Sequence, residues 1–190
     1  MATPLPFYIR EDDPPAKRAI LRAALHLFST QGLAETSIRD IARRSGFTNP
    51  ALYKHFASKQ QLALHLFDTC HTRLWTRCSA AVAAQRTGAR KLAAYVGQWL
   101  ELVDEHPDVM AFLSDSARVL WPQAGATVRR RTMIGLARSL LRDATNPDLA
   151  AACLQGTLAE LARMIQVGVV AGPAARWKPA VLTLFRRLAT

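Results

Sequence analysis

The sequence is poor in cysteine and lacks a long uninterrupted apolar run. Its three cysteines are an odd number in a chain of 190 residues, so we expect no disulfide framework and a reducing compartment: Cys70, Cys78 and Cys153. Acidic residues 11–13 occupy a place where a signal peptide needs an apolar core, and the most apolar later stretch, 156–172, contains Glu160 and Arg163. We therefore expect a soluble cytoplasmic protein without a membrane partner.

Signatures of catalysis and of metal binding are also missing. There is no G-x-S-x-G elbow, no glycine-rich phosphate loop, no H-E-x-x-H, and no Ser or Cys beside a recognisable base. Four possible metal ligands share one predicted helix, but none forms a tight i, i+4 pair, and packed thiols and surface histidines are the favoured interpretation: His65, Cys70, His71 and Cys78. We expect no enzyme, no metal site and no cofactor.

Acidic residues are scarce relative to basic ones. The chain has 14 Asp and Glu against 25 Lys and Arg, a formal charge of +11 and an isoelectric point near 10.6. Such an excess favours a polyanionic partner, although charge alone does not separate DNA from an anionic membrane.

Residues 36–59 are the most informative stretch and predict two short helices joined by a tight turn. Ser37 is the expected N-cap of the first helix, and Asp40 completes a capping-box spacing. Gly46 ends that helix at about Ser45 with a left-handed conformation, and a three-residue elbow follows. Pro50 fixes the start of the second helix and favours an N-cap at Asn49.

Once the apolar positions of this stretch are placed inside, the outer surface carries cations and neutral hydrogen-bonding groups. Such a surface suits a DNA duplex, with phosphates at the rim and base edges in the groove. Arg39 and the start of the second helix are the expected base readers, and the later residues the expected phosphate contacts. The candidate DNA-binding residues are Ser37, Arg39, Thr48, Asn49, Pro50, Ala51, Tyr53, Lys54, His55 and Lys59.

The same stretch resembles the DNA-binding signature of TetR-family transcriptional regulators. The resemblance runs from Thr36 to Leu62, about a quarter of the chain, and is carried by T-S-I-R-D-I-A-x-x-S-G-F-T-x-x-x-L-Y-x-H-F-x-S-K-x-x-L. Pro50 departs from many relatives at the start of the second helix. The resemblance implies a homodimer on a palindromic operator, an effector cavity in the middle helices and a four-helix dimer bundle.

The rest of the chain has helical periodicity and no convincing period-two alternation, so an all-α fold of about nine helices is predicted. We expect an N-terminal arm over residues 1–13, a three-helix DNA-binding head over 14–57, and an effector-binding and dimerisation body over 58–190. Asp13 is the expected N-cap of the first helix. Ser58 caps a long helix, one helix spans about 126–144, one runs from Pro147 to about Ala171, and the last reaches Leu188.

Bulky side chains of the middle helices are candidates for the effector pocket, although plain core packing explains them equally well. They are Trp75, Trp99, Phe112, Trp121, Met133 and Met164. The last two helices each carry apolar residues on two faces, and a helix apolar on two sides needs two partners. The candidate dimer residues are Leu154, Leu158, Leu161, Ile165, Leu184 and Phe185.

The predicted function is a homodimeric, ligand-responsive transcriptional repressor that binds double-stranded DNA and an unknown small molecule. Two alternatives stay open. One is a non-specific architectural DNA-binding protein that uses the +11 charge. The other is a ligand-binding relative that no longer binds DNA, which the basic surface of residues 36–59 disfavours.

Overall fold

The computed structural model describes residues 5–186, and throughout this range the regular structure is helical, which confirms the all-α prediction. The chain divides into two compact units. Unit 1 contains the residues up to His71 and Asp108–Val128, and unit 2 contains Thr72–Pro107 and the residues from Arg129 onward. The long helix α4 (Lys59–Ala83) contributes its first half to unit 1 and its second half to unit 2.

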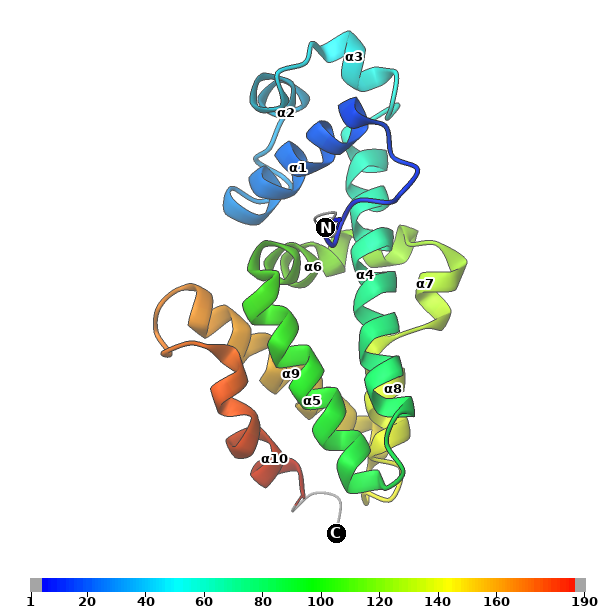
Figure 1. Cartoon of the computed structure of the whole chain (residues 1–190), viewed down its shortest axis with the longest axis vertical. Helices are drawn as coiled ribbons and strands as arrows, with labels where there is room; N and C mark the ends of the chain where they lie inside the picture. The colour runs from blue at the N-terminus through cyan, green and yellow to red at the C-terminus, as the bar shows by residue number, and fades with distance from the viewer. Residues whose placement is uncertain (1–4, 187–190) are drawn as a thin grey trace. The chain divides into compact units, whose positions relative to one another are not determined.

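Unit 1 is built around α1 (Pro15–Thr30), which packs on α2 (Ile38–Ser45); α2 in turn contacts α3 (Asn49–Tyr53) (Figure 1). The unit also contains most of α6 (Pro107–Leu120) and the short helix η1 (Trp121–Gln123). Its core holds an aromatic cluster in which Phe112 stacks on Phe28 at 5.7 Å between ring centroids and meets Phe67 edge-on at 6.5 Å. This cluster joins α1, α4 and α6.

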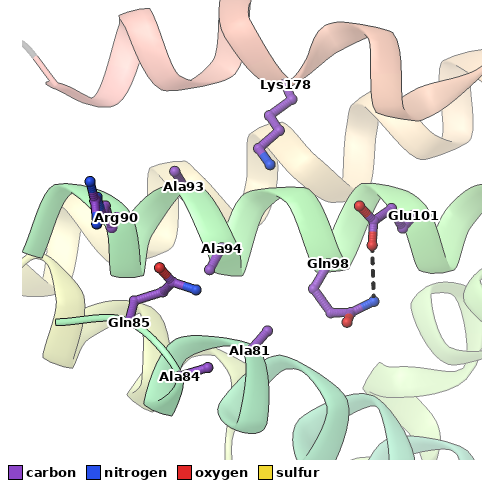
Figure 2. Close-up of a pocket in the computed structure, with 9 residues that line it drawn as sticks. All are labelled: Ala81, Ala84, Gln85, Arg90, Ala93, Ala94, Gln98, Glu101 and Lys178. Carbon is purple, nitrogen blue, oxygen red and sulfur yellow. Dashed lines mark hydrogen bonds between the residues drawn. The ribbon is translucent and has the colours of Figure 1, made fainter. Parts of the chain in front are cut away.

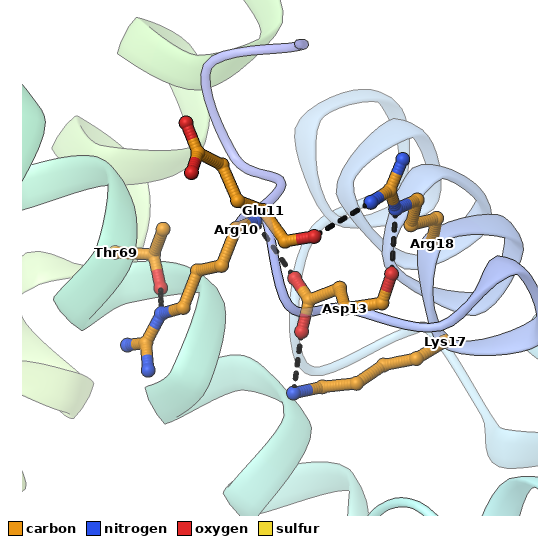
Figure 3. A network of polar contacts seen from close by, with 6 residues as sticks. All are labelled: Arg10, Glu11, Asp13, Lys17, Arg18 and Thr69. Carbon is orange, nitrogen blue, oxygen red and sulfur yellow. Dashed lines mark hydrogen bonds and ion pairs between the residues drawn. The ribbon is translucent and has the colours of Figure 1, made fainter.

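Residues 5–13 of the N-terminal arm belong to unit 1 and are packed, whereas the sequence led us to expect Phe7, Tyr8 and Arg10 to be exposed or loosely packed. Ile9 is 1% exposed, and Arg10 reaches α4, where its Nε donates to Thr69 Oγ1 at 3.1 Å. Asp13 is not an N-cap, because Pro14 takes that position. The buried Asp13 carboxylate instead accepts from the Arg10 N–H at 2.8 Å and pairs with Lys17 at 2.6 Å (Figure 3).

The local charges decide the ionisation of Asp13. Burial alone would raise the pKa of this carboxyl, but the hydrogen bonds from Lys17 and the Arg10 backbone outweigh burial and lower the pKa. Arg18 adds hydrogen bonds to the Asp13 and Glu11 carbonyls at 2.6 and 2.9 Å (Figure 3). The arm is therefore held to both α1 and α4.

Unit 2 is organised around α5 (Gly88–Glu105), which contacts α8 (Met133–Leu140), α9 (Pro147–Gln166), η2 (Ala174–Trp177) and α10 (Lys178–Arg186). The buried Tyr95 hydroxyl lies 2.5 Å from Gln155 Oε1 and 3.3 Å from the Met133 carbonyl. Asp104 accepts from the Ala174 and Ala175 N–H groups at 2.6 and 2.9 Å, which fixes the entry into η2 and α10.

Several helix boundaries differ from the prediction. The expected helix over 126–144 is two helices, α7 (Ala126–Arg130) and α8, because the Thr132 side chain accepts from the Gly135 N–H at 2.8 Å and caps a new start. α9 ends at Gln166, five residues early, and Gly168 follows in the left-handed region with φ 75°. The expected end at Leu188 lies outside the described residues. Over 5–186, no helix combines the length and apolarity needed to cross a bilayer.

We expect the free energy of unfolding to depend on pH because His71 of α4 is buried. Its ring is 6% exposed between Phe67 and Trp121, and burial lowers its pKa to about 4 from 6.5. The unfolded chain therefore binds the proton between pH 6.5 and 4 while the folded chain does not, so stability falls as pH drops through this window. Between pH 7 and pH 5 the loss is about 2 kcal/mol.

Urea unfolding of the wild type and of His71→Phe at pH 7 and pH 5 measures this contribution. The variant should lose about 2 kcal/mol less than the wild type between the two pH values, because it has no proton to take up at this position. Identical pH dependence in the two proteins would show that His71 titrates alike in the folded and unfolded chains.

Candidate DNA-binding surface

The turn between α2 and α3 has the predicted local geometry. Ser37 Oγ accepts from the Asp40 N–H at 3.2 Å, and the Asp40 carboxylate accepts from the Ser37 N–H at 3.1 Å, so the capping box is confirmed. Gly46 has φ 76° and ends α2, as expected. The Phe47 N–H then bonds to the Ala42 carbonyl at 3.1 Å, which fixes the direction in which the chain leaves α2.

α3 begins one residue earlier than predicted. Thr48 is its N-cap, Asn49 is already helical, and Pro50 lies in the first turn, where its missing N–H has no cost. Leu52 and Phe56 are 1% and 7% exposed and anchor the helix to the core of unit 1. Because these two side chains point inward, the opposite side of the short helix faces outward.

The structure places most predicted DNA contacts on this outer side. The exposed ones are Ser37, Arg39, Thr48, Pro50, Tyr53 and Lys54, and the half-buried ones are Asn49, Ala51 and His55. The Ser37 hydroxyl is already engaged within the capping box, so it is a poor candidate for base readout.

Asp40 is the single acidic residue in the sequence of 36–59, and it is internally neutralised. Its carboxylate accepts from the Ser37 hydroxyl and backbone and from Arg43 Nη2 at 2.6 Å. These hydrogen bonds and the charge of Arg43 lower the pKa of Asp40. The surface therefore presents the cations Arg39, Arg44 and Lys54 without an uncompensated carboxylate.

The structure does not support the prediction that Lys59 contacts a DNA phosphate, because its ammonium faces inward. Nζ donates to three backbone carbonyls of the segment that joins α1 to α2, those of Leu33 at 2.8 Å, Ala34 at 3.2 Å and Thr36 at 2.7 Å. An ammonium has three N–H donors, so none is left for a phosphate. A sequence signal existed: a cation in the first turn opposes the helix dipole, so Lys59 needed another partner.

The six pocket candidates are distributed over both units. Phe112 and Trp121 belong to the aromatic cluster of unit 1, and Trp75, Trp99, Met133 and Met164 to unit 2. Trp99 is 3% exposed, and its indole N–H has no acceptor in the described part of the chain. Arg131 stacks on Trp75, with 4.9 Å between its guanidinium carbon and the ring centroid.

The dimer candidates separate by exposure, and some of them need correction. Leu154 and Leu158 of α9 are fully buried and Phe185 of α10 is 3% exposed, so these three pack against their own chain and offer no surface to a partner. Leu161 and Ile165 are half-buried, and Leu184 is 59% exposed. The exposed apolar stripe of α9 is instead the one that contains Leu149, 60% exposed, and Cys153.

The fold and this surface define a helix-turn-helix protein with a helical body. Residues 20–66 match the family model for bacterial regulatory proteins of the tetR family. The HTH-type transcriptional repressor Rv3405c of Mycobacterium tuberculosis is 46% identical over 56 residues, which are 30% of this chain and 30% of that protein. The HTH-type transcriptional activator FasR of Mycolicibacterium smegmatis is 28% identical over 152 residues, 80% of this chain and 66% of that protein.

Solved structures share the fold over nearly the whole chain. A tetR-family regulatory protein from Rhodococcus RHA1 aligns with a TM-score of 0.78 over 91% of this chain and 98% of that chain, at 19% identity. The regulator KstR2 of Mycobacterium tuberculosis aligns with a TM-score of 0.75 over 87% of this chain and 90% of that chain, at 21% identity. Residues 20–66 therefore carry the TetR-family signature and the whole chain shares the fold of these regulators, although the matched segment spans only 30% of the first curated relatives.

Lys54 and Lys59 form a matched pair of lysines for testing the inward role of Lys59. Lys59→Gln should lower the free energy of unfolding by about 2 kcal/mol, because the charge-assisted bonds to three carbonyls are lost. Lys54→Gln removes an exposed cation and should stay within about 0.5 kcal/mol of the wild type. Urea unfolding at pH 7 measures both variants, and equal stabilities would contradict the assignment.

Proposed function

We propose that this chain is a sequence-specific DNA-binding transcriptional regulator. The observation that carries the proposal is the outer side of α2 and α3, which combines exposed cations and hydrogen-bonding groups with one acid that is internally neutralised. A protein that only needs charge to hold DNA requires no defined turn. Here a capping box, a left-handed glycine and two buried anchors fix the orientation of a five-residue helix.

The contacts divide into two kinds. Arg39 on α2 and the first residues of α3 are the base readers, since the N-terminal part of a recognition helix meets base edges in the major groove. Tyr53, Lys54 and His55 lie at the other end of α3 and contact phosphates, which set position and register but not sequence. Lys59 takes no part in either group.

The regulator acts as a homodimer through α9 and α10. Support comes from exposed apolar side chains that a monomer leaves in water, Leu149 at 60% and Leu184 at 59%. Two-fold symmetry then requires two inverted half-sites, with centres about 34 to 36 Å or a multiple of this distance apart.

We expect repression and not activation, because a protein that represses by occupying an operator needs no contact with the polymerase. The relatives carry names of both signs, a repressor in Rv3405c and an activator in FasR. The helical body is the part that senses a small molecule. A structural neighbour of this fold, FadR of Bacillus subtilis, is in complex with stearoyl-CoA and aligns with a TM-score of 0.68 at 16% identity.

Binding of Arg39→Ala to a selected operator and to random duplex tests sequence readout. A lost bidentate contact to a base should cost about 1 to 3 kcal/mol on the operator and relax one operator position. Lys54→Gln is the matched control, because a phosphate contact is lost equally on both duplexes. Fluorescence anisotropy measures the affinities of the wild type and both variants on both duplexes, and an equal loss on both duplexes for Arg39→Ala would remove this residue from the base readers.

Adjacent residues of α10 test the dimer. Leu184→Glu should give a folded monomer, because the new charge falls on the exposed partner surface. Phe185→Glu should unfold unit 2 instead, because it buries an unpaired charge. Sedimentation velocity and circular dichroism distinguish the two outcomes. A wild-type chain that is monomeric at micromolar concentration would contradict the homodimer.

A further inference from the structure

The positive charge of the chain lies mainly outside the unit that carries the DNA-binding surface. By sequence, unit 1 has 10 Lys and Arg against 8 Asp and Glu, a net charge of +2. Unit 2 has 15 against 6, a net charge of +9. The proposed operator contacts lie on α2 and α3 of unit 1 and do not account for this excess. The excess gives unit 2 a positive potential of its own, which attracts anions.

Unit 2 contains a groove of about 400 Å³ between the end of α4, one side of α5 and the start of α10 (Figure 2). Four alanines give it an apolar lining without bulky side chains: Ala81 of α4, Ala84 just after α4, and Ala93 and Ala94 of α5. Two cations, Arg90 and Lys178, line the same groove. Its only carboxylate, Glu101, accepts a hydrogen bond from Gln98 at 3.4 Å.

Lys178 extends across the groove because Gly97 leaves room for it. A Cβ at position 97 would overlap the ammonium and lie 2.9 Å from Lys178 Cε. Glycine in the interior of α5 is less favourable than alanine, so the helix carries an intrinsic disadvantage at this point. In the described part of the chain no carboxylate or carbonyl pairs with the Lys178 ammonium.

Arg90 adds to the positive potential at the start of α5. The first turn of this helix contains no acidic residue and carries Arg90 followed by Lys91. A helix N-terminus favours anions, so two cations there oppose the helix dipole and leave a region of unbalanced positive charge. An anion bound beside Arg90 and Lys178 relieves this repulsion.

We propose that this groove binds an amphipathic carboxylate, a linear apolar chain that ends in one carboxyl group. The carboxylate lies between Arg90 and Lys178, and the apolar chain lies along the four alanines. Both parts of the ligand are needed, because charge-assisted hydrogen bonds orient the head while burial of the chain supplies the hydrophobic contribution. The role of this ligand as an effector rests on the proposed function. The binding of the ligand to the groove does not depend on that function.

Isothermal titration calorimetry of the DNA-free full chain with decanoate tests the site. Acetate supplies the charge without the chain, and decan-1-ol the chain without the charge, so both should bind at least about tenfold more weakly than decanoate. Lys178→Gln and Arg90→Gln should each weaken decanoate binding about tenfold. Lys91→Gln is the matched control, because it removes one cation from the same helix turn but does not line the groove.

Gly97→Ala gives a second test that changes no charge. Its methyl group displaces the Lys178 ammonium, so decanoate should bind several-fold more weakly, while circular dichroism shows an unchanged fold. Equal affinity of the wild type, Lys178→Gln and Gly97→Ala would overturn the site, as would a loss in Lys91→Gln that matches the loss in Lys178→Gln. Absence of decanoate binding to the wild type would overturn it too.

The same proteins separate the failure of this site from the failure of the proposed function. Operator binding without any decanoate binding rejects the groove and leaves the regulator intact. Decanoate binding that needs Lys178 but leaves operator affinity unchanged supports the groove and removes its role as an effector site. Decanoate binding without operator binding supports the groove and rejects the DNA-binding regulator.

Discussion

The helix-turn-helix of unit 1 is tied to α4 through the ammonium group of Lys59 and the three carbonyls that it joins. The segment between α1 and α2 has backbone carbonyls without helical partners, and such groups are costly when they lose water unpaired. One lysine from the first turn of α4 satisfies the carbonyls of Leu33, Ala34 and Thr36 together. Because this segment leads directly into the Ser37 cap, the position of α2 follows from the start of α4.

A second set of contacts holds the other side of the helix-turn-helix to the same helix. Phe56, which follows α3, meets the His65 ring of α4 edge-on at 5.4 Å and has the Lys17 ammonium 5.6 Å from its centroid. Lys17 is in turn fixed by the buried Asp13. Burial is the main cause that lowers the pKa of His65 to about 4, so this imidazole is neutral at pH 7 and adds no charge beside Lys17. The helix-turn-helix is therefore held within unit 1 both before α2, by Lys59, and after α3, by Phe56.

The sequence predicted those features that depend on a few neighbouring residues. The capping box of Ser37, the left-handed Gly46 and the start of α4 after Ser58 each need only local backbone chemistry, and each is present. Contacts between distant segments were missed, as with Lys59, because the carbonyls it binds are more than twenty residues away. Periodicity also identified two apolar stripes on α9 but not which one faces the chain's own core, since both have the same spacing. The buried Leu154 and the exposed Leu149 show the difference that only packing decides.

Net charge calculated from the sequence likewise does not show which charges remain free on the surface after folding. The formal charge of +11 indicated a polyanionic partner, yet unit 1 carries only +2 and still presents a cationic surface. The charges of Asp13 and Asp40 are neutralised by internal hydrogen bonds and ion pairs, while Arg39, Arg44 and Lys54 stay exposed. Affinity for phosphates follows the cations that reach them, not the total charge, because separated surface charges are screened beyond about 10 Å at 0.1 M salt. Unit 2 has its own excess of cations, and the groove proposed above combines two of them, Arg90 and Lys178, with an apolar lining.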